Sequence, residues 1–424
     1  MNIYLDTIGC RLNQSEIETY ARQFRSAGHT LVSDPAEADL AVINTCTVTA
    51  PGAADSRKKI RLVARAGCTN TIVTGCWSTL EPREALALPG VSQVIPNREK
   101  EILVSRVLNT SQESFDQEPL SREPIPGARS RTRAFIKVQD GCNNRCTFCV
   151  TTLARGMSRS RTIAEVIADI RAALQGDVKE AVLTGVHLGS WGDDLPNNQT
   201  LKDLVSIILQ DTDLPRLRLS SLEPWDLEDD FFSLWENPRL ARHLHLPLQS
   251  GCATTLQRMA RKTTPKAFAR LMETARNAIP NLAITTDVMV GFPGEDESEF
   301  AESLAFVKEM NFSRGHVFTY SARPGTAAAG MPDQVPHAIR KVRNLQIRAV
   351  LAESASAYQI RFLGQRLGVL WESATTMGSD GWAMSGLTDN YLRVTAQTPN
   401  QLWNQITPVR LTHLTDRGLI GQIG

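Results

Sequence analysis

The sequence lacks the long apolar runs that anchor a protein in a membrane and the large net charge that would attract a charged polymer to its whole surface. It contains no uninterrupted apolar run long enough to span a bilayer, and its start, MNIYLDTIGC, lacks the basic residues and apolar stretch of a signal peptide. Its 46 Lys and Arg residues nearly balance 45 Asp and Glu residues, giving a formal net charge of +1. We therefore expect no membrane partner, and any nucleic-acid affinity must come from a local patch.

Cysteine is also scarce, because eight in 424 residues are too few for a disulfide scaffold. We expect a cytoplasmic, reducing location, where unpaired thiols indicate metal binding, redox chemistry or burial. Low-complexity tracts are missing, and the 42% hydrophobic and 21% charged residues are typical of a folded globular chain. The length predicts two or three domains.

The pattern of apolar runs predicts an α/β multidomain fold. In residues 1–108, short apolar runs alternate with helical patterns, which predicts a parallel sheet covered by helices. The apolar runs lie at 3–5, 40–43 and 71–74, and the helical patterns at about 14–26 and 55–66. Residues 109–127 are polar, acidic and proline-bearing, and we interpret them as a linker.

The alternation resumes in residues 128–358 and predicts a second α/β domain. Its strand candidates are 135–138, 181–184, 217–220, 244–248, 283–290 and 315–319. Helical patterns lie between them, most clearly at 163–174, 266–278 and 297–310. Six β-α repeats predict a partial (β/α)6 barrel, whose chemistry lies at the carboxyl ends of the strands.

A long arginine-rich helix at roughly 337–360 precedes a segment of different character, residues 361–424. Strand-like pieces alternate there with glycine and polar turns, which predicts a small all-β barrel. Trp371 and Trp382 either offer stacking surfaces to bases or fill this barrel.

Three cysteines, Cys142, Cys146 and Cys149, form a C-x3-C-x2-C cluster directly after a predicted strand and a glycine turn. Closely spaced thiolates are suitable ligands for an iron–sulfur cluster or for zinc. A structural zinc site requires four ligands, however, and no fourth Cys or His lies nearby in the sequence. Three thiolates on a four-iron cube leave one iron open. The alternative is three buried cysteines without a shared role.

A second set, Cys10, Cys46 and Cys76, is dispersed in the chain, yet each cysteine follows a predicted strand. Because the carboxyl ends of parallel strands share one sheet edge, these thiols can converge there on a second open-iron cluster. Three unrelated core cysteines remain an alternative. Cys68 and Cys252 fit neither set, and we interpret them as inert small side chains.

With Phe148 before the last cysteine, the motif reads C-x3-C-x-φ-C and resembles the signature of radical S-adenosylmethionine (SAM) enzymes. The order of the cysteines, the segments TIGCRLNQSE, INTCTVT, VTGCW, ARGMSRSR, LTGVHLGSWG, SSLEP and GFPGE, and the terminal barrel together resemble the methylthiotransferase family across nearly the whole chain. The terminal segment is similar to a TRAM domain, an RNA-binding module. Trp77 and Thr152 stand where the family commonly has Tyr and Pro.

The resemblance implies two [4Fe–4S] clusters and two equivalents of SAM per turnover. It implies that Cys142, Cys146 and Cys149 bind SAM through an open iron and yield a 5′-deoxyadenosyl radical. It also implies an auxiliary, sulfur-bearing cluster at Cys10, Cys46 and Cys76. Further SAM-binding candidates are Phe148, Thr184, Gly185, Ser221, Glu223, Gln249 and Asp287. Gly185 is equally well explained by a tight turn, and Glu223 by a solvated loop.

The implied partners are a tRNA anticodon stem-loop, a flavodoxin- or ferredoxin-type electron donor and a sulfur donor. Residues 121–161 hold nine basic residues against two acids, a local charge of +7 where an RNA phosphate would be favoured. The RNA-binding candidates are Arg155, Arg159, Arg161 and Arg393. Solvated helix faces explain part of this basic set.

The segments LTGVHLGSWG and SSLEP most resemble the MtaB-type branch, which implies methylthiolation at C2 of N6-threonylcarbamoyladenosine-37 in tRNA. The alternatives are isopentenyladenosine-37 (MiaB-type), an aspartate of a ribosomal protein, and an iron–sulfur RNA-binding module without turnover.

Overall fold

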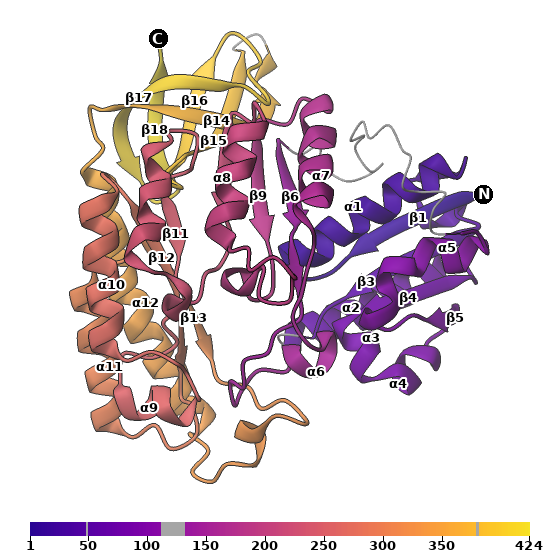
Figure 1. Cartoon of the computed structure of the whole chain (residues 1–424), viewed down its shortest axis with the longest axis horizontal. Coiled ribbons are helices and arrows are strands. Elements are labelled where there is room, and N and C mark those ends of the chain that lie inside the picture. Colours follow the sequence, from indigo (N-terminus) through magenta and orange to yellow (C-terminus); the bar gives the residue numbers. More distant parts are fainter. Residues whose placement is uncertain (48–49, 112–131, 379–380) are drawn as a thin grey trace. The chain divides into compact units, whose positions relative to one another are not determined.

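The computed structural model describes residues 1–47, 50–111, 132–378 and 381–424 (Figure 1). The chain divides into two compact units. We call Met1–Asn144, Val150–Asp177 and Thr184–Val186 the first unit, and Arg145–Cys149, Val178–Leu183 and His187–Gly424 the second unit. The predicted linker at 109–127 lies almost entirely outside the described residues. The predicted domain boundaries stay a prediction.

The first unit is built on a parallel five-stranded sheet with the order β2-β1-β3-β4-β5. Its strands are β1 (Asn2–Thr7), β2 (Thr30–Val32), β3 (Leu40–Thr45), β4 (Thr71–Gly75) and β5 (Val91–Val94). Its first helices are α1 (Arg11–Ser26), α2 (Ala50–Arg65), α3 (Cys76–Leu80), α4 (Pro82–Leu86) and α5 (Leu103–Leu108). The predicted repeated β-α units are thus present.

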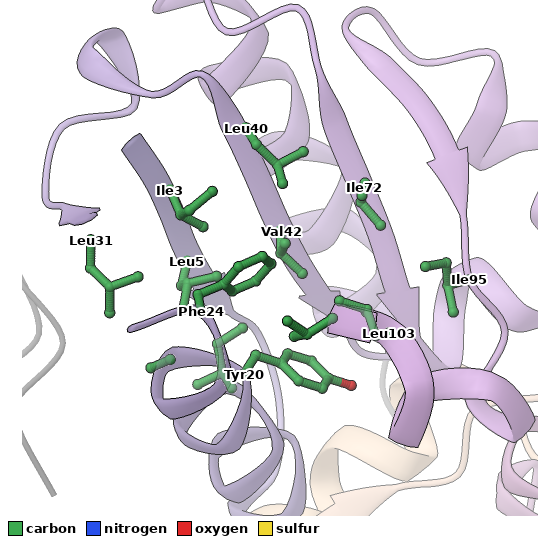
Figure 2. Packing of buried hydrophobic residues seen from close by; sticks show 13 residues of the cluster. Ile3, Leu5, Tyr20, Phe24, Leu31, Leu40, Val42, Ile72, Ile95 and Leu103 are labelled. Carbon is green, nitrogen blue, oxygen red and sulfur yellow. The ribbon is translucent and has the colours of Figure 1, made fainter. Parts of the chain in front are cut away.

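Helix α1 packs on one face of this sheet because its apolar side chains recur with helical spacing. Ile17, Tyr20 and Phe24 form one stripe, and Figure 2 shows Tyr20 and Phe24 against strand residues such as Leu5. Each large side chain buried in this way contributes about 1.5–3 kcal/mol relative to exposure. The packing fixes the carboxyl ends of β1, β3 and β4, where the dispersed cysteines lie.

The remaining elements of the first unit precede and follow the C-x3-C-x2-C loop in the sequence. They are β6 (Arg133–Lys137), β7 (Gln139–Asp140), α6 (Thr151–Arg155), β8 (Arg159–Ser160) and α7 (Ile163–Gln175). Helix α7 begins with a capping box in which Thr162 and Glu165 satisfy each other's backbone N–H groups. A 3-10 helix, η2 (Asn97–Ile102), precedes α5.

The second unit contains the other predicted β-α repeats. Its strands are β9 (Glu180–Thr184, whose last residue belongs to the first unit), β10 (Arg216–Leu219), β11 (His243–His245), β12 (Ala283–Val290) and β13 (Arg314–Thr319). Strands β9 and β10 pair in parallel, β11-β12-β13 form a parallel sheet, and the bridge Ser221↔His245 links the two sets. The helices are α8 (Leu201–Asp211), α9 (Ala253–Arg258), α10 (Pro265–Ala278), α11 (Glu297–Met310) and α12 (His337–Ile360).

A closed five-stranded barrel ends the second unit, with the order β14-β15-β16-β18-β17. Its strands are β14 (Arg366–Thr376), β15 (Trp382–Thr388), β16 (Arg393–Thr398), β17 (Ile406–Thr415) and β18 (Gly418–Ile423). Trp371 is fully buried in this barrel and donates its Nε1–H to Thr407 Oγ1 at 2.8 Å. It therefore fills the core and offers no stacking surface. The α/β multidomain fold class is confirmed.

Candidate functional site

The dispersed cysteines Cys10, Cys46 and Cys76 gather at one edge of the five-stranded sheet. Thr45 and Gly75 are register partners on β3 and β4, and each is followed directly by a cysteine. The backbone N–H of Ile8 donates to Asn44 O at 2.9 Å, which extends the pairing of β1 with β3 toward Cys10. A methyl group at Gly9 would lie 3.0 Å from the Sγ of Cys46, so the two loops touch. The edge predicted from strand order is the one observed.

Two buried asparagines hold this group of cysteines, and sequence reasoning missed both. Asn13 Nδ2 donates to the carbonyls of Ile8 and Thr45 at 2.9 and 3.0 Å, and Asn13 Oδ1 lies 3.6 Å from Cys10 Sγ. Asn97 Nδ2 donates to Cys76 Sγ at 3.6 Å and to Ala154 O at 2.8 Å. No local sequence pattern predicts that a single asparagine will hydrogen-bond to a cysteine elsewhere in the fold. Only the packing shows these roles.

A buried group of charges lies beside the same loops: Glu16, Lys100, Asp140 and Arg155. Lys100 Nζ lies 2.5 Å from Glu16 Oε1 and also contacts Asp140. Arg155 Nη1 contacts Glu16 and Asp140 at 3.0 and 2.9 Å. Burial raises the pKa of Glu16, but Lys100 and Arg155 outweigh this and lower it to about 2. The carboxylates are therefore charged, and removing one cation would leave an uncompensated buried charge.

This arrangement corrects the predicted role of Arg155. Its side chain is only 2% exposed, and its guanidinium also donates to Asn13 Oδ1. Arg155 therefore fixes the loop that carries Cys10 and is not available to an RNA phosphate. Arg155 also affects the pKa of the Cys76 thiol: burial raises this pKa, and the nearby guanidinium opposes the rise.

The C-x3-C-x2-C loop is tightly held at both of its ends. Gln139 Nε2 donates to the carbonyl of Gly141 and to Ser158 Oγ, at 2.7 and 2.8 Å. In the first unit, Cys142 N donates to Gly156 O at 3.0 Å. In the second unit, Cys149 N donates to Cys146 O at 3.0 Å and Thr147 Oγ1 donates to Arg258 O at 2.9 Å. Each end of the loop is thus held by contacts within its own unit.

Gly141 offers a test of this loop, because a Cβ there would lie 1.9 Å from Met157 O at a φ of +71°. We expect Gly141→Ala to cost at least about 2 kcal/mol and to reduce the iron content of reconstituted protein. Gly156→Ala is the matched control, since its φ is +77° but the nearest atom, on Arg159, is 3.8 Å away. Thermal unfolding and iron analysis measure both variants. Equal effects of the two substitutions would contradict the importance of this close approach.

Arg261 is a further functional candidate that the sequence did not reveal. Its Nη1 lies 3.7 Å from Cys146 Sγ and 3.2 Å from Glu223 Oε1, and its Nη2 lies 2.5 Å from Glu223 Oε2. The guanidinium also stacks over the Trp225 ring, with its centre 4.5 Å from the ring centroid. Glu223 is thus the partner of a buried arginine rather than a solvated loop acid.

The other predicted SAM-binding residues have different surroundings. Phe148 packs at the edge of Phe292, with ring centroids 6.4 Å apart. Thr184 is buried and its carbonyl accepts from Val138 N at 3.0 Å, while the adjacent Gly185 is half-buried. Ser221 is exposed and forms the bridge to His245 of β11.

Gln249 and Asp287 meet at the end of the β11-β12-β13 sheet. Gln249 has a φ of +70°, and its N–H donates to Asp287 O at 2.8 Å. The Asp287 carboxylate lies 3.4 Å from His245 Nε2 and 3.5 Å from His316 Nδ1. Burial raises the pKa of Asp287, but hydrogen bonds from the two histidines hold it well below its usual range. Asp287 therefore has the partners that a buried acid needs.

Within the described part of the chain, no three His, Cys, Asp or Glu side chains are close enough to hold one metal ion. This finding does not conflict with a four-iron cluster, because each thiolate then binds a different iron atom. Soft thiolates without a fourth protein ligand fit such a cluster, so the residues present suit the group. Cys68 and Cys252 are both buried.

The remaining basic candidates differ in their availability. Arg161 is paired with Asp169 at 2.6 Å and donates to Lys137 O at 2.9 Å. Arg159 is exposed and lies 3.8 Å from Asp140. Arg393 is exposed on β16 and donates to Ser385 Oγ at 3.3 Å. Arg159 and Arg393 thus remain accessible to a ligand, whereas the Arg161 guanidinium is already engaged.

Two family models match the chain. The model described as the radical SAM superfamily matches residues 136–307, and the model described as uncharacterized protein family UPF0004 matches residues 2–96. Among solved structures, the radical SAM methyltransferase TsrM from Kitasatospora setae has a TM-score of 0.60 at 13% identity, covering 77% of this chain and 75% of its own. At that identity the likeness shows the fold alone. Within the described residues, no helix has the length and apolarity required to cross a membrane.

The fold and the cysteine loop define a radical SAM enzyme, a class that uses S-adenosylmethionine and a [4Fe–4S] cluster. The threonylcarbamoyladenosine tRNA methylthiotransferase MtaB of Bacillus subtilis is 36% identical over 96% of this chain and 92% of the relative. MtaB of Thermotoga maritima is 34% identical over 99% and 96%. The tRNA-2-methylthio-N(6)-dimethylallyladenosine synthase of Cereibacter sphaeroides is 31% identical over 99% and 98%. The chain belongs to the radical SAM methylthiotransferase family.

Proposed function

We propose that this enzyme inserts a methylthio group at C2 of N6-threonylcarbamoyladenosine-37 in tRNA. The observation that carries the proposal is the presence of two sets of three cysteines, one in the C-x3-C-x2-C loop and one at the edge of the five-stranded sheet. A reaction that adds sulfur and carbon to an unactivated position needs two such centres. The threonylcarbamoyl branch is supported by the 36% and 34% identity to two MtaB proteins; a third MtaB and the dimethylallyladenosine synthase are each 31% identical.

We assign Cys142, Cys146 and Cys149 to the SAM-binding [4Fe–4S] cluster and Cys10, Cys46 and Cys76 to the auxiliary one. When bound, these groups and two equivalents of SAM supply an electron, radical chemistry at the substrate carbon, a sulfur atom and a methyl group. The reaction requires an electron donor of flavodoxin or ferredoxin type and a separate sulfur donor. Phe148, Thr184, Gly185, Ser221, Glu223, Gln249 and Asp287 stay the predicted SAM-binding residues.

The protein's own residues contribute position and charge. Asn13 and Asn97 hold the loops of Cys10 and Cys76, so the auxiliary thiols keep their spacing. Arg155 is paired on both sides with carboxylates and keeps these loops fixed at a modest electrostatic cost. A rigid, preorganised set of ligands is what a site for radical chemistry needs, because supporting groups set the geometry of the ligands.

A cleft of about 710 Å³ in the second unit is our proposed surface for the tRNA backbone. It lies among α12, the start of β13 and the turns of the barrel. Arg314, Arg393 and Arg417 line it with one acid, Asp416, and all three arginines are exposed. Arginine side chains with a local excess of positive charge bind phosphates and release counterions. This cleft replaces Arg155 in the predicted RNA contact.

Arg393→Ala tests this surface. We expect about a 3- to 10-fold loss of affinity for an anticodon stem-loop RNA, and a decrease of about 0.7–0.9 in the slope of log K against log salt. Fluorescence anisotropy at several salt concentrations measures both. Arg366→Ala is the matched control, because Arg366 is an exposed arginine of the same barrel outside the cleft. An equal loss in the control, or an unchanged slope for Arg393→Ala, would contradict the assignment.

The substrate itself is tested by mass spectrometry of tRNA nucleosides from cells with and without the gene. We expect the methylthio form of N6-threonylcarbamoyladenosine to disappear in the deletion strain and to return on complementation. The methylthio form of isopentenyladenosine should be unchanged. The reverse pattern would assign the protein to the isopentenyl branch, and a change in neither nucleoside would leave the ribosomal-protein aspartate as the substrate to examine.

A further inference from the structure

The guanidinium of Arg261 is held in place from three sides. Glu223 binds it through both carboxylate oxygens, Pro247 O accepts from Nη2 at 2.9 Å, and the Trp225 ring covers its face. The side chain is only 2% exposed. A planar guanidinium with this many partners has one orientation, because its donors form a rigid fork.

In that orientation one N–H of Arg261 points at a cysteine. Nη1 lies 3.7 Å from Cys146 Sγ, and the same nitrogen is bound to Glu223. The group that contacts the sulfur is therefore the cation of the pair, and the carboxylate serves to hold that cation. If Arg261 served only to connect Glu223 with the Pro247 carbonyl, none of its N–H groups would need to point at Cys146.

A hydrogen bond and a positive charge beside a cluster thiolate have a definite redox consequence. Reduction adds negative charge to an iron–sulfur cluster, and donors to its sulfurs favour the more negative state. Arg261 is buried and Cys146 is half-buried, so water screens this effect less than it would at an exposed site. The cluster next to Arg261 should therefore be easier to reduce than one without this donor.

We propose that Arg261 is a positioning residue that holds Cys146 and raises the reduction potential of the cluster bound by Cys142, Cys146 and Cys149. The inference rests on the proposed function only in assigning a cluster to these cysteines. Glu223 acts through Arg261, and Trp225 fixes the plane of the guanidinium. Loss of the arginine would make electron delivery to the cluster harder without removing a ligand.

The test uses full-length protein in which Cys10, Cys46 and Cys76 are replaced by Ala, so that one cluster remains. We compare the parent with Arg261→Gln, Arg261→Lys and Arg258→Gln, and measure iron content and the midpoint potential by titration followed by electron paramagnetic resonance. Arg258 is the matched control: it is three residues earlier, and its guanidinium binds Glu299, Pro293 O and Thr255 Oγ1 and not a cysteine of the C-x3-C-x2-C loop.

We expect Arg261→Gln to shift the midpoint potential to a more negative value, Arg261→Lys to shift it less, and Arg258→Gln to leave it at the parent value. Loss of iron from Arg261→Gln at parental helicity, with iron kept by Arg258→Gln, would also support the positioning role. An unchanged potential in Arg261→Gln with full iron, or an equal shift in Arg258→Gln, would overturn the proposal.

A second variant covers the case in which Arg261→Gln does not fold because Glu223 is left as a half-buried, unpaired acid. The double variant Arg261→Gln/Glu223→Gln removes both charges, and its potential must also be more negative than that of the parent. A parent that binds no cluster at all would contradict the proposed function instead, so the two failures are distinguishable.

Discussion

Cys146→Ala should abolish the cleavage of SAM. The C-x3-C-x2-C loop has no fourth Cys or His nearby in the sequence, so the loss of one thiolate leaves a four-iron cluster with two protein ligands. The loss should exceed the roughly 10- to 100-fold decrease typical for a residue that only supports a ligand. Anaerobically reconstituted, dithionite-reduced protein should form no detectable 5′-deoxyadenosine.

Cys252→Ala is the control for this experiment. Cys252 lies in the same unit and is 1% exposed, so its removal costs packing but no ligand. We expect a cost in stability of about 1 kcal/mol and parental SAM cleavage. If Cys146→Ala still formed 5′-deoxyadenosine, the assignment of the loop would be wrong. An absence of SAM cleavage in the unmodified protein would instead favour an RNA-binding module without turnover.

Cys76→Ala should separate the two halves of the reaction. Cys76 follows β4, and Asn97 donates to its sulfur on the first unit's sheet edge, remote in sequence from the C-x3-C-x2-C loop. We expect 5′-deoxyadenosine formation to continue, while methylthiolated nucleoside falls below detection. The physical reason is that the auxiliary cluster loses one of three ligands and the SAM-binding set keeps all three. Liquid chromatography with mass spectrometry measures both products in one sample.

The matched control here is Cys68→Ala, because Cys68 is a buried cysteine in an apolar cluster of the same unit. Cys68→Ala should keep both products and the full iron content of the parent. Cys76→Ala should lose about half of the parental iron, because one of the two clusters loses a ligand. Methylthio product at the parental level in Cys76→Ala would refute the auxiliary site. Loss of both products at unchanged helicity would show that the two sets of cysteines do not act separately.

Much of the fold was accessible from apolar periodicity. Helices α11 and α12 begin and end where the pattern predicts, and β12 coincides with its predicted range. Strands β2 and β5 escaped prediction because they have only 3 and 4 residues, too few to show alternation. They are stabilised by pairing with β1 and β4, which are distant in sequence.

Of the sequence features, the local charge count was the least reliable for predicting the RNA-binding surface. Counting charges in residues 121–161 predicted a basic surface, and the part from 121 to 131 lies outside the described residues. In the part that is described, Lys137, Arg155 and Arg161 are neutralised by Glu101, Glu16 and Asp169. All three acids lie outside residues 121–161, so a count within that range cannot include them. The tertiary structure therefore moves the proposed RNA surface to the cleft beside the barrel.

The sequence by itself determined the class of chemistry, because spacing within one loop and position after parallel strands constrain where thiols lie. It could not determine which polar side chains support those thiols. Asn13, Asn97 and Arg261 reach their cysteines through contacts that only the folded chain makes. Hydrogen bonds to sulfur depend on distances of a few ångströms between segments up to 115 residues apart, and no local pattern encodes them. The ligands are thus a property of the sequence, and their environment is a property of the tertiary structure.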